Sequence, residues 1–259
     1  MFSLPLLYTM EVWWAGFNTH PWRLAAYVLA TFILLLGYNR YGGLRHDTGM
    51  TEVAIDSVEE LGLGIIIAAL ALFLLGRITP GMPVNEIAGQ IVIEAMTVAI
   101  GVSVGTAQLG GDKEDEGIGG GGDAKEQPEI QFSGQMLFAF CGATLFAANV
   151  APTEEIIMIA VESSWLRLVG LAFLSLLIGS LILHYSEFTG TRQFVRGDGL
   201  STVVVESVIT YAVALSTAAL ILWFFGRFDG VSLYTSLAQT IVLGVAATLG
   251  ASAGRLLLQ

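Results

Sequence analysis

Charged residues are scarce in this chain: Asp, Glu, Lys and Arg make up 13% of its 259 residues, against roughly 25% in a soluble domain. Lysine and arginine number 11 and the acids 22, so the net charge is −11. A basic surface for nucleic acid is therefore missing, as is a polybasic patch for anionic lipid. Cysteine occurs once, at Cys141, which excludes an intramolecular disulfide and predicts a buried, inert thiol.

Common enzyme motifs are missing as well. Histidine occurs three times, at His20, His46 and His184, without the H-E-x-x-H spacing of a zinc protease. The chain has no Walker A loop. We therefore expect neither an enzyme nor a cofactor.

Hydrophobic sequence is abundant: hydrophobic residues make up 54% of the chain, and the mean hydropathy is +0.73. Seven apolar stretches are each long enough to cross ~30 Å of hydrocarbon at about 1.5 Å per residue. Because a backbone in lipid must satisfy its own hydrogen bonds, these stretches predict helices and an all-α membrane protein in a lipid bilayer. The alternation of a membrane barrel is absent. The predicted spans lie near 22–39, 58–76, 84–107, 134–151, 165–185, 203–225 and 232–254.

Two segments do not fit a membrane span. Residues 1–21 lack the basic region and cleavage site of a signal peptide, and the tryptophans at Trp13 and Trp14 predict a helix at the headgroup level. Residues 108–131 carry seven acids, two lysines and a run of glycines, which predicts a flexible, solvated loop. A calcium-binding loop is the alternative, although the ligand spacing of an EF-hand is absent.

Several short motifs occur twice in the same order, about 150 residues apart, which is a signature of internal duplication. We interpret 22–107 and 165–259 as two three-span repeats, joined by a linker helix and the loop after it at 132–164. One helix between two three-helix units gives both units the same orientation, so the predicted repeats are parallel. The recurring motifs are Gly76-Arg77 with Gly226-Arg227, Asp56-Ser57-Val58 with Glu206-Ser207-Val208, Gln90 with Gln239, and Gly101-x-Ser103-x-Gly105 with Gly250-x-Ser252-x-Gly254.

Positive charges predict the orientation, because loops on the cytoplasmic side carry more Lys and Arg. Seven lie near the span ends on the C-terminal side of the membrane and four near the ends on the other side. The count predicts an outside N-terminus and a cytoplasmic C-terminus in the cell (inner) membrane.

The third span carries a polar stripe whose members are three or four residues apart and so share one helical face. The stripe consists of Gln90, Glu94, Thr97, Gly101 and Gly105.

Glu94 lies near mid-bilayer, where an unpaired charge costs several kcal/mol. We expect it to bind a cation, to pair with a donor, or to stay protonated. The alternative is a protonated Glu94 hydrogen-bonded to Gln239 or a backbone carbonyl as structural glue. The second repeat has Leu243 at this place, so any function of the acid is asymmetric.

Glycines in spans three and seven predict close helix packing, either between these two spans or with their neighbours. The packing glycines are Gly101, Gly105, Gly250 and Gly254. If the two faces meet at the repeat axis, Gln90 and Gln239 meet there too. They would then line a pore or hold the two halves together.

Further acids lie near both ends of the spans. Asp56 and Glu206 occupy matching positions at the start of two spans, where they either line an ion path or complement the helix dipole. At the other end, oxygen-rich groups around a proline suit a hard cation such as Na⁺ or Ca²⁺. A capped helix start with acids in its first turn is the alternative there. This second set comprises Glu86, Asn149, Glu154 and Glu155.

Two segments, Glu11-Val-Trp-Trp-Ala-Gly-Phe17 and Asn149-Val-Ala-Pro-Thr-Glu-Glu155, resemble signature segments of a prokaryotic family of integral membrane proteins of unknown function. The resemblance covers most of the chain and implies a topology without a ligand or a catalytic residue. The three-one-three order of helices is also similar to the SWEET sugar transporters, whose Pro-Gln motif is missing here. Microbial rhodopsins need a lysine in the last span, whereas the lysines here are Lys113 and Lys125, so retinal binding is excluded.

These patterns predict a channel or secondary carrier that passes a small cation or protons along a path lined by carboxylates. Glu94 would be the central binding or exchange group, with Gln90 and Gln239 as neutral neighbours. The alternative is a non-transporting membrane sensor, or an assembly or scaffold protein. A homo-oligomer and a metal site are left open.

Overall fold

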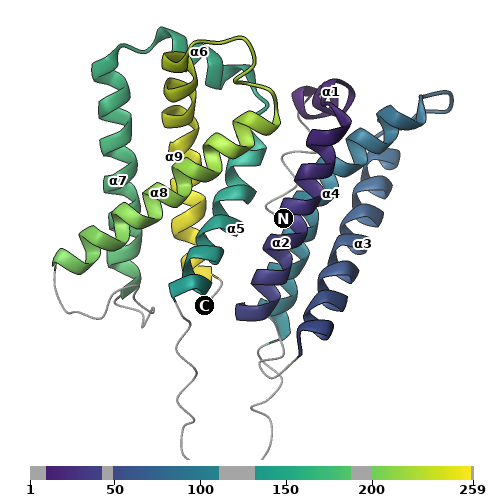
Figure 1. Ribbon diagram of the computed structural model, residues 1–259, viewed down its shortest axis with the longest axis horizontal. Coiled ribbons are helices and arrows are strands. Elements are labelled where there is room, and N and C mark those ends of the chain that lie inside the picture. The colour runs from purple at the N-terminus through teal and green to yellow at the C-terminus, as the bar shows by residue number, and fades with distance from the viewer. Residues whose placement is uncertain (1–9, 43–48, 111–131, 188–199, 258–259) are drawn as a thin grey trace, which may run out of the picture.

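A computed structural model describes residues 10–42, 49–110, 132–187 and 200–257 (Figure 1). Within these ranges the regular secondary structure is entirely helical and contains no strand. The predicted all-α class is confirmed. The helices are α1 (Met10–Asn18), α2 (Pro21–Gly42), α3 (Met50–Leu74), α4 (Val84–Gly110), α5 (Phe132–Val150), α6 (Glu154–Glu162), α7 (Trp165–Glu187), α8 (Leu200–Phe224) and α9 (Leu233–Leu257).

In the described residues, seven helices are long and apolar enough to cross a membrane, namely α2, α3, α4, α5, α7, α8 and α9. The seven predicted spans are thereby confirmed, with ends that shift by a few residues. The largest shift is in α3, which begins at Met50 instead of residue 58. Asp56 therefore lies in the second turn of a helix and not at its start. Polar residues extend this helix because only its later turns must meet hydrocarbon.

Two short helices, α1 and α6, lie at the same end of the molecule (Figure 1). Each has nine residues and precedes a long helix after a two-residue link. Residues 152–164 were predicted as loop, and α6 occupies most of them. A short helix is stable here because it buries one face: Ile156 and Ala160, four residues apart, are 4% and 1% exposed. In α1, Val12 and Gly16 are buried at the same spacing.

The helices form two bundles, with α1–α4 in the first and α5–α9 in the second (Figure 1). In the first bundle, α4 packs against α1, α2 and α3. In the second, α9 packs in the same way against α6, α7 and α8. The linker helix α5 packs mainly on α9 and α8, and it contacts the first bundle through α2 and α4. The interpretation of the two bundles as parallel repeats stays a prediction.

Glycine allows α5 and α9 to approach closely. A Cβ added at Gly142 of α5 would lie 2.8 Å from the Cα of Gly254, and one added at Gly250 would lie 2.8 Å from the Cβ of Phe146. Two of the predicted packing glycines, Gly250 and Gly254, thus face α5. By contrast, a Cβ added at Gly105 would meet nothing within 4 Å.

The recurring Gly-Arg pair ends α3 and α8. Gly76 and Gly226 have φ angles of +67° and +72°, a conformation that glycine adopts without strain. The backbone N–H of the next residue, Arg77 or Arg227, donates to a carbonyl five residues back, at 2.8 and 2.9 Å. Each arginine then contacts a residue in or next to the short helix of its own bundle. Arg77 lies 3.8 Å over the ring of Trp13 in α1, and Arg227 donates to the Pro152 carbonyl just before α6.

The predicted acidic, glycine-rich loop falls mostly on 111–131, outside the described residues. The described part of 108–131 consists of the last residues of α4.

Candidate functional site

Glu94 lies inside the first bundle without a polar partner. Its side chain is 0% exposed, and neither carboxyl oxygen has a hydrogen-bond partner. Thr97 donates its hydroxyl to the backbone carbonyl of Glu94 at 3.0 Å, which leaves the carboxyl group unsatisfied. Ile93 and Ala95, the chain neighbours of Glu94, are buried apolar residues. Such a burial is costly for a carboxylate, because water is removed and no donor replaces it.

Gln90 lies one turn before Glu94 on the same face of α4. It is 3% exposed, and its side-chain oxygen Oε1 also lacks a partner. The short helix α1 covers it closely, since a Cβ added at Gly16 would lie 2.8 Å from the Gln90 backbone nitrogen. The polar face predicted from the spacing therefore carries three unsatisfied oxygens.

Tyr27 belongs to α2, which packs against α4, and it is a further buried polar residue of this bundle. It is 7% exposed, its hydroxyl has no hydrogen-bond partner, and it lies within electrostatic range of Glu94. Its ring stacks on Phe224 of α8, with the ring centroids 4.3 Å apart. We refer to Gln90, Glu94 and Tyr27 as the Glu94 site.

Gln239, which the predicted repeat matches with Gln90, lies on α9 in the second bundle. It is 0% exposed, and both atoms of its amide lack a partner. In the described residues α4 and α9 have no extended contact, and α5 packs between them (Figure 1). The structure therefore does not join the glycine faces of spans three and seven. Of the two predicted arrangements, packing with a neighbouring helix is observed for the glycines of span seven, and it does not bring Gln90 and Gln239 together along a glycine face.

A hydrogen-bonded cluster lies at the far end of the first bundle from α1. The amide of Asn39 donates to Glu60 Oε2 at 2.8 Å and to the hydroxyl of Ser57 at 3.1 Å. The hydroxyl of Ser103 donates to the Asn39 side-chain oxygen at 3.1 Å. Asp56, one turn before Glu60, is half-buried beside this cluster.

The corresponding end of the second bundle holds a buried ion pair. Arg255 donates to Glu206 Oε2 at 3.1 Å, to the Thr210 hydroxyl at 3.0 Å and to Gln135 Oε1 at 3.2 Å. The side chains of Arg255 and Glu206 are 1% and 3% exposed. Glu206, predicted to line an ion path, is thus neutralised by a guanidinium group of the chain itself.

The other predicted mouth is at the end of the molecule where α1 and α6 lie. Asn149, half-buried, donates to the Leu145 carbonyl within α5. Glu154 and Glu155 are exposed in the first turn of α6, and Glu86 is half-buried in the first turn of α4.

Arg227 lies close to these acids. Burial lowers the pKa of its guanidinium, and the nearby carboxylates Glu154 and Glu11 act in the opposite direction. Glu154 and Glu11 belong to different short helices, so their charges converge on Arg227 at this end. In the described parts of the chain, no three His, Cys, Asp or Glu side chains are grouped to hold a metal ion.

Sequence reasoning missed two of these residues. Tyr27 begins a buried stripe on α2 that continues with Thr31 and Leu35 at steps of four, and this spacing was the available signal. Arg255 was counted only as a charge at a span end. Its place in the last turns of an apolar helix, opposite the acid Glu206, was the signal for an ion pair.

No match was found among curated proteins or solved structures. One family model, described as "Putative integral membrane protein (DUF2391)", matches residues 1–258. The match confirms the predicted resemblance, and with seven helices able to cross a bilayer it describes a multi-pass protein embedded in lipid. The chain belongs to this family of integral membrane proteins.

Proposed function

We propose that this protein transports a small cation or protons across the membrane, and that Glu94 is the group that binds and releases the transported ion. The observation that supports this proposal is the buried carboxyl group whose two oxygens have no hydrogen-bond partner. An ionisable group at this depth usually serves an ion pathway. A proton or a cation would satisfy oxygens that nothing else in the described structure satisfies.

The other buried acids provide the contrast. Glu60 accepts from Asn39, and Glu206 is paired with Arg255. This is how buried polar groups act when they hold helices together. Glu94 lacks such partners, so a purely structural role explains it less well than ion binding does.

The proposed path connects the Glu94 site with the two ends of the molecule. At the end that carries α1 and α6, Glu86, Glu154, Glu155 and Asn149 would attract the ion. At the other end the half-buried Asp56 would do so. With the orientation given by the positive charges, this second end faces the cytoplasm.

Reconstitution into liposomes tests the proposal. The purified protein is screened for uptake of H⁺, Na⁺, K⁺, Mg²⁺ and Ca²⁺, beside the variant Glu94→Gln and the control Glu162→Gln, which changes an exposed acid at the end of α6. We expect uptake by the wild type and by the control, and uptake by Glu94→Gln at the level of empty liposomes. All three proteins are compared at equal reconstituted amounts by gel.

Uptake by Glu94→Gln equal to that of the wild type would reject Glu94 as the exchange group. If the wild type transports none of these cations, the alternative function replaces the proposed transport. The protein is then a non-transporting sensor, or an assembly or scaffold protein, whose buried polar groups serve packing.

A further inference from the structure

The charge at the Glu94 site limits what the site can bind. In the described residues, neither oxygen of the Glu94 carboxyl group has a hydrogen-bond partner, and no salt bridge reaches it. When ionised, Glu94 therefore contributes a single negative charge to a site that is closed to water.

Neighbouring helices could bring further charges to the Glu94 site. The helices that pack against α4 are α1, α2, α3 and α5. On α2, Tyr27 interacts with Glu94. Glu60 of α3 and Cys141 of α5 interact instead with Tyr38, in the separate apolar cluster around Phe138.

On α1, the Glu11 carboxylate interacts electrostatically with Arg227, which follows α8. The titratable side chain that interacts electrostatically with Glu94 is the Tyr27 phenol, which is neutral at physiological pH.

One bound positive charge makes such a site neutral. A divalent cation would leave a net charge of one unit in a low-dielectric interior, and an uncompensated buried charge is strongly unfavourable. Gln90 Oε1 and the Tyr27 hydroxyl supply neutral oxygens, which suit either a protonated carboxyl group or a dehydrated alkali metal ion.

We propose that the Glu94 site takes a cation of single positive charge, a proton or an alkali metal ion, that it rejects divalent cations, and that the Tyr27 hydroxyl contacts the ion once it is bound. The inference rests on the proposed transport function and narrows its substrate class. Tyr27 acts as a binding residue from α2, while its ring remains stacked on Phe224.

The test compares cations in one preparation of proteoliposomes. Internal pyranine reports H⁺, and radioactive sodium, rubidium, magnesium and calcium report the metal ions. Each is measured for the wild type, Glu94→Gln, Tyr27→Phe and the control Tyr211→Phe. Tyr211 is a suitable control because its hydroxyl also lacks a partner, but it lies on α8 and no interaction joins it to Glu94.

We expect uptake of H⁺, sodium or rubidium that Glu94→Gln abolishes, and no Glu94-dependent uptake of magnesium or calcium. Tyr27→Phe should raise the half-saturating cation concentration about tenfold, since an oxygen that contacts the bound cation is lost. Tyr211→Phe should match the wild type. Comparison of H⁺ uptake with sodium and rubidium uptake shows whether the transported ion is a proton or an alkali metal ion.

Magnesium or calcium uptake that disappears in Glu94→Gln would overturn this inference while leaving the proposed function in place. Equal effects of Tyr27→Phe and Tyr211→Phe would overturn the role of Tyr27. Absence of every cation flux would remove the proposed function, and this inference with it. Size-exclusion profiles of each variant in detergent separate loss of folding from loss of binding.

Discussion

Glu94 and Glu206 are both buried acids in membrane helices, yet their surroundings differ. Glu206 shares a guanidinium group with Thr210 and Gln135, whereas the Glu94 carboxyl has no partner in the described residues. A buried charge that is paired and hydrogen-bonded is a structural element. A buried acid without a partner has to be neutralised by something that comes from outside the chain.

The ion pair leads to a prediction about stability. Arg255→Met leaves the Glu206 carboxylate buried without its cation, so we expect unfolding in detergent to require about 3–5 kcal/mol less free energy. The double variant Glu206→Leu with Arg255→Met removes both charges and should recover most of that loss. Thermal unfolding followed by circular dichroism measures both variants. A double variant as unstable as Arg255→Met would contradict the charge-pairing account.

Single residues were predictable where chain position alone determines the environment. Glu94 lies some ten residues into an apolar stretch, so its burial follows from the sequence. Arg255 and Glu206 are 49 positions apart, and Tyr27 and Glu94 come from different helices. Contacts of that kind depend on which helix faces pack together, and periodicity within one helix does not determine this.

At the scale of elements, glycines determine which helices approach closely. Gly142 lies against Gly250 and Gly254, so backbone meets backbone between α5 and α9. Small residues at such contacts are typical of membrane helices, because lipid provides no hydrophobic force to drive helices together.

This contact predicts a difference between two substitutions of the same kind. Gly142→Ala forces α5 and α9 apart and should destabilise the protein by about 1–3 kcal/mol. Gly105→Ala meets nothing within 4 Å and should be neutral, or stabilising by up to about 1 kcal/mol through helix propensity. Melting temperatures in one detergent measure both. A Gly142→Ala variant as stable as Gly105→Ala would show that the close approach is not needed.

The long helices were predictable and the short ones only in part. A run of some 20 apolar residues has one stable form in lipid, which is why all seven spans were found. Tryptophans marked α1, whereas α6 was predicted as loop. Its nine residues are too few to form a stable helix alone, so it depends on burying Ile156 and Ala160.

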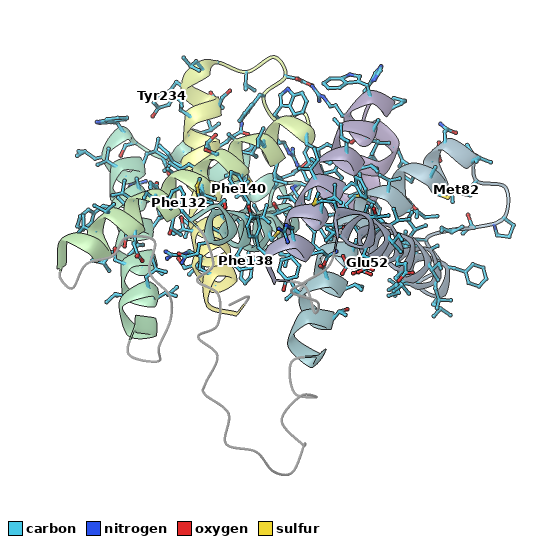
Figure 2. The ribbon with its side chains drawn as sticks, turned by 60° about the horizontal axis from the view of Figure 1, so that its bottom comes forward. Glu52, Met82, Phe132, Phe138, Phe140 and Tyr234 are labelled. Atoms are coloured by element: carbon cyan, nitrogen blue, oxygen red, sulfur yellow. The ribbon has the colours of Figure 1, made fainter. Side chains whose placement is uncertain are left out.

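At the scale of the whole molecule, aromatic and charged contacts join the two bundles. Near α1, Arg23 pairs with Asp229 at 2.8 Å, and the rings of Trp22 and Trp223 lie 5.2 Å apart. Towards the other end, Phe138 of α5 packs edge-on against Tyr38 of α2, with the ring centroids 5.5 Å apart. Phe138 is labelled in Figure 2. These contacts lie between residues far apart in sequence, and no motif in the chain predicts them.

The pair of Arg23 and Asp229 should make the contact between bundles sensitive to acid. The hydrogen bond from Arg23 holds the pKa of Asp229 below its ordinary value. The folded state therefore gains stability above the ordinary pKa of Asp and loses it as the pH falls through the lowered value. The protection of amides in the first turns of α2 against hydrogen exchange, relative to the intrinsic exchange rate at each pH, should fall in acid for the wild type. Asp229→Asn should show the lower protection already at neutral pH. Identical pH profiles of the two proteins would contradict the prediction.

The central claim is that the buried Glu94 carboxyl group exchanges a singly charged cation, and infrared difference spectroscopy tests it most directly. Spectra of the wild type and Glu94→Gln in liposomes are compared as the pH or the sodium concentration is raised. The account predicts a carboxyl absorption, present in the wild type and absent from the variant, that changes when the cation is exchanged. A Glu94 signal that stays constant under every condition would contradict it.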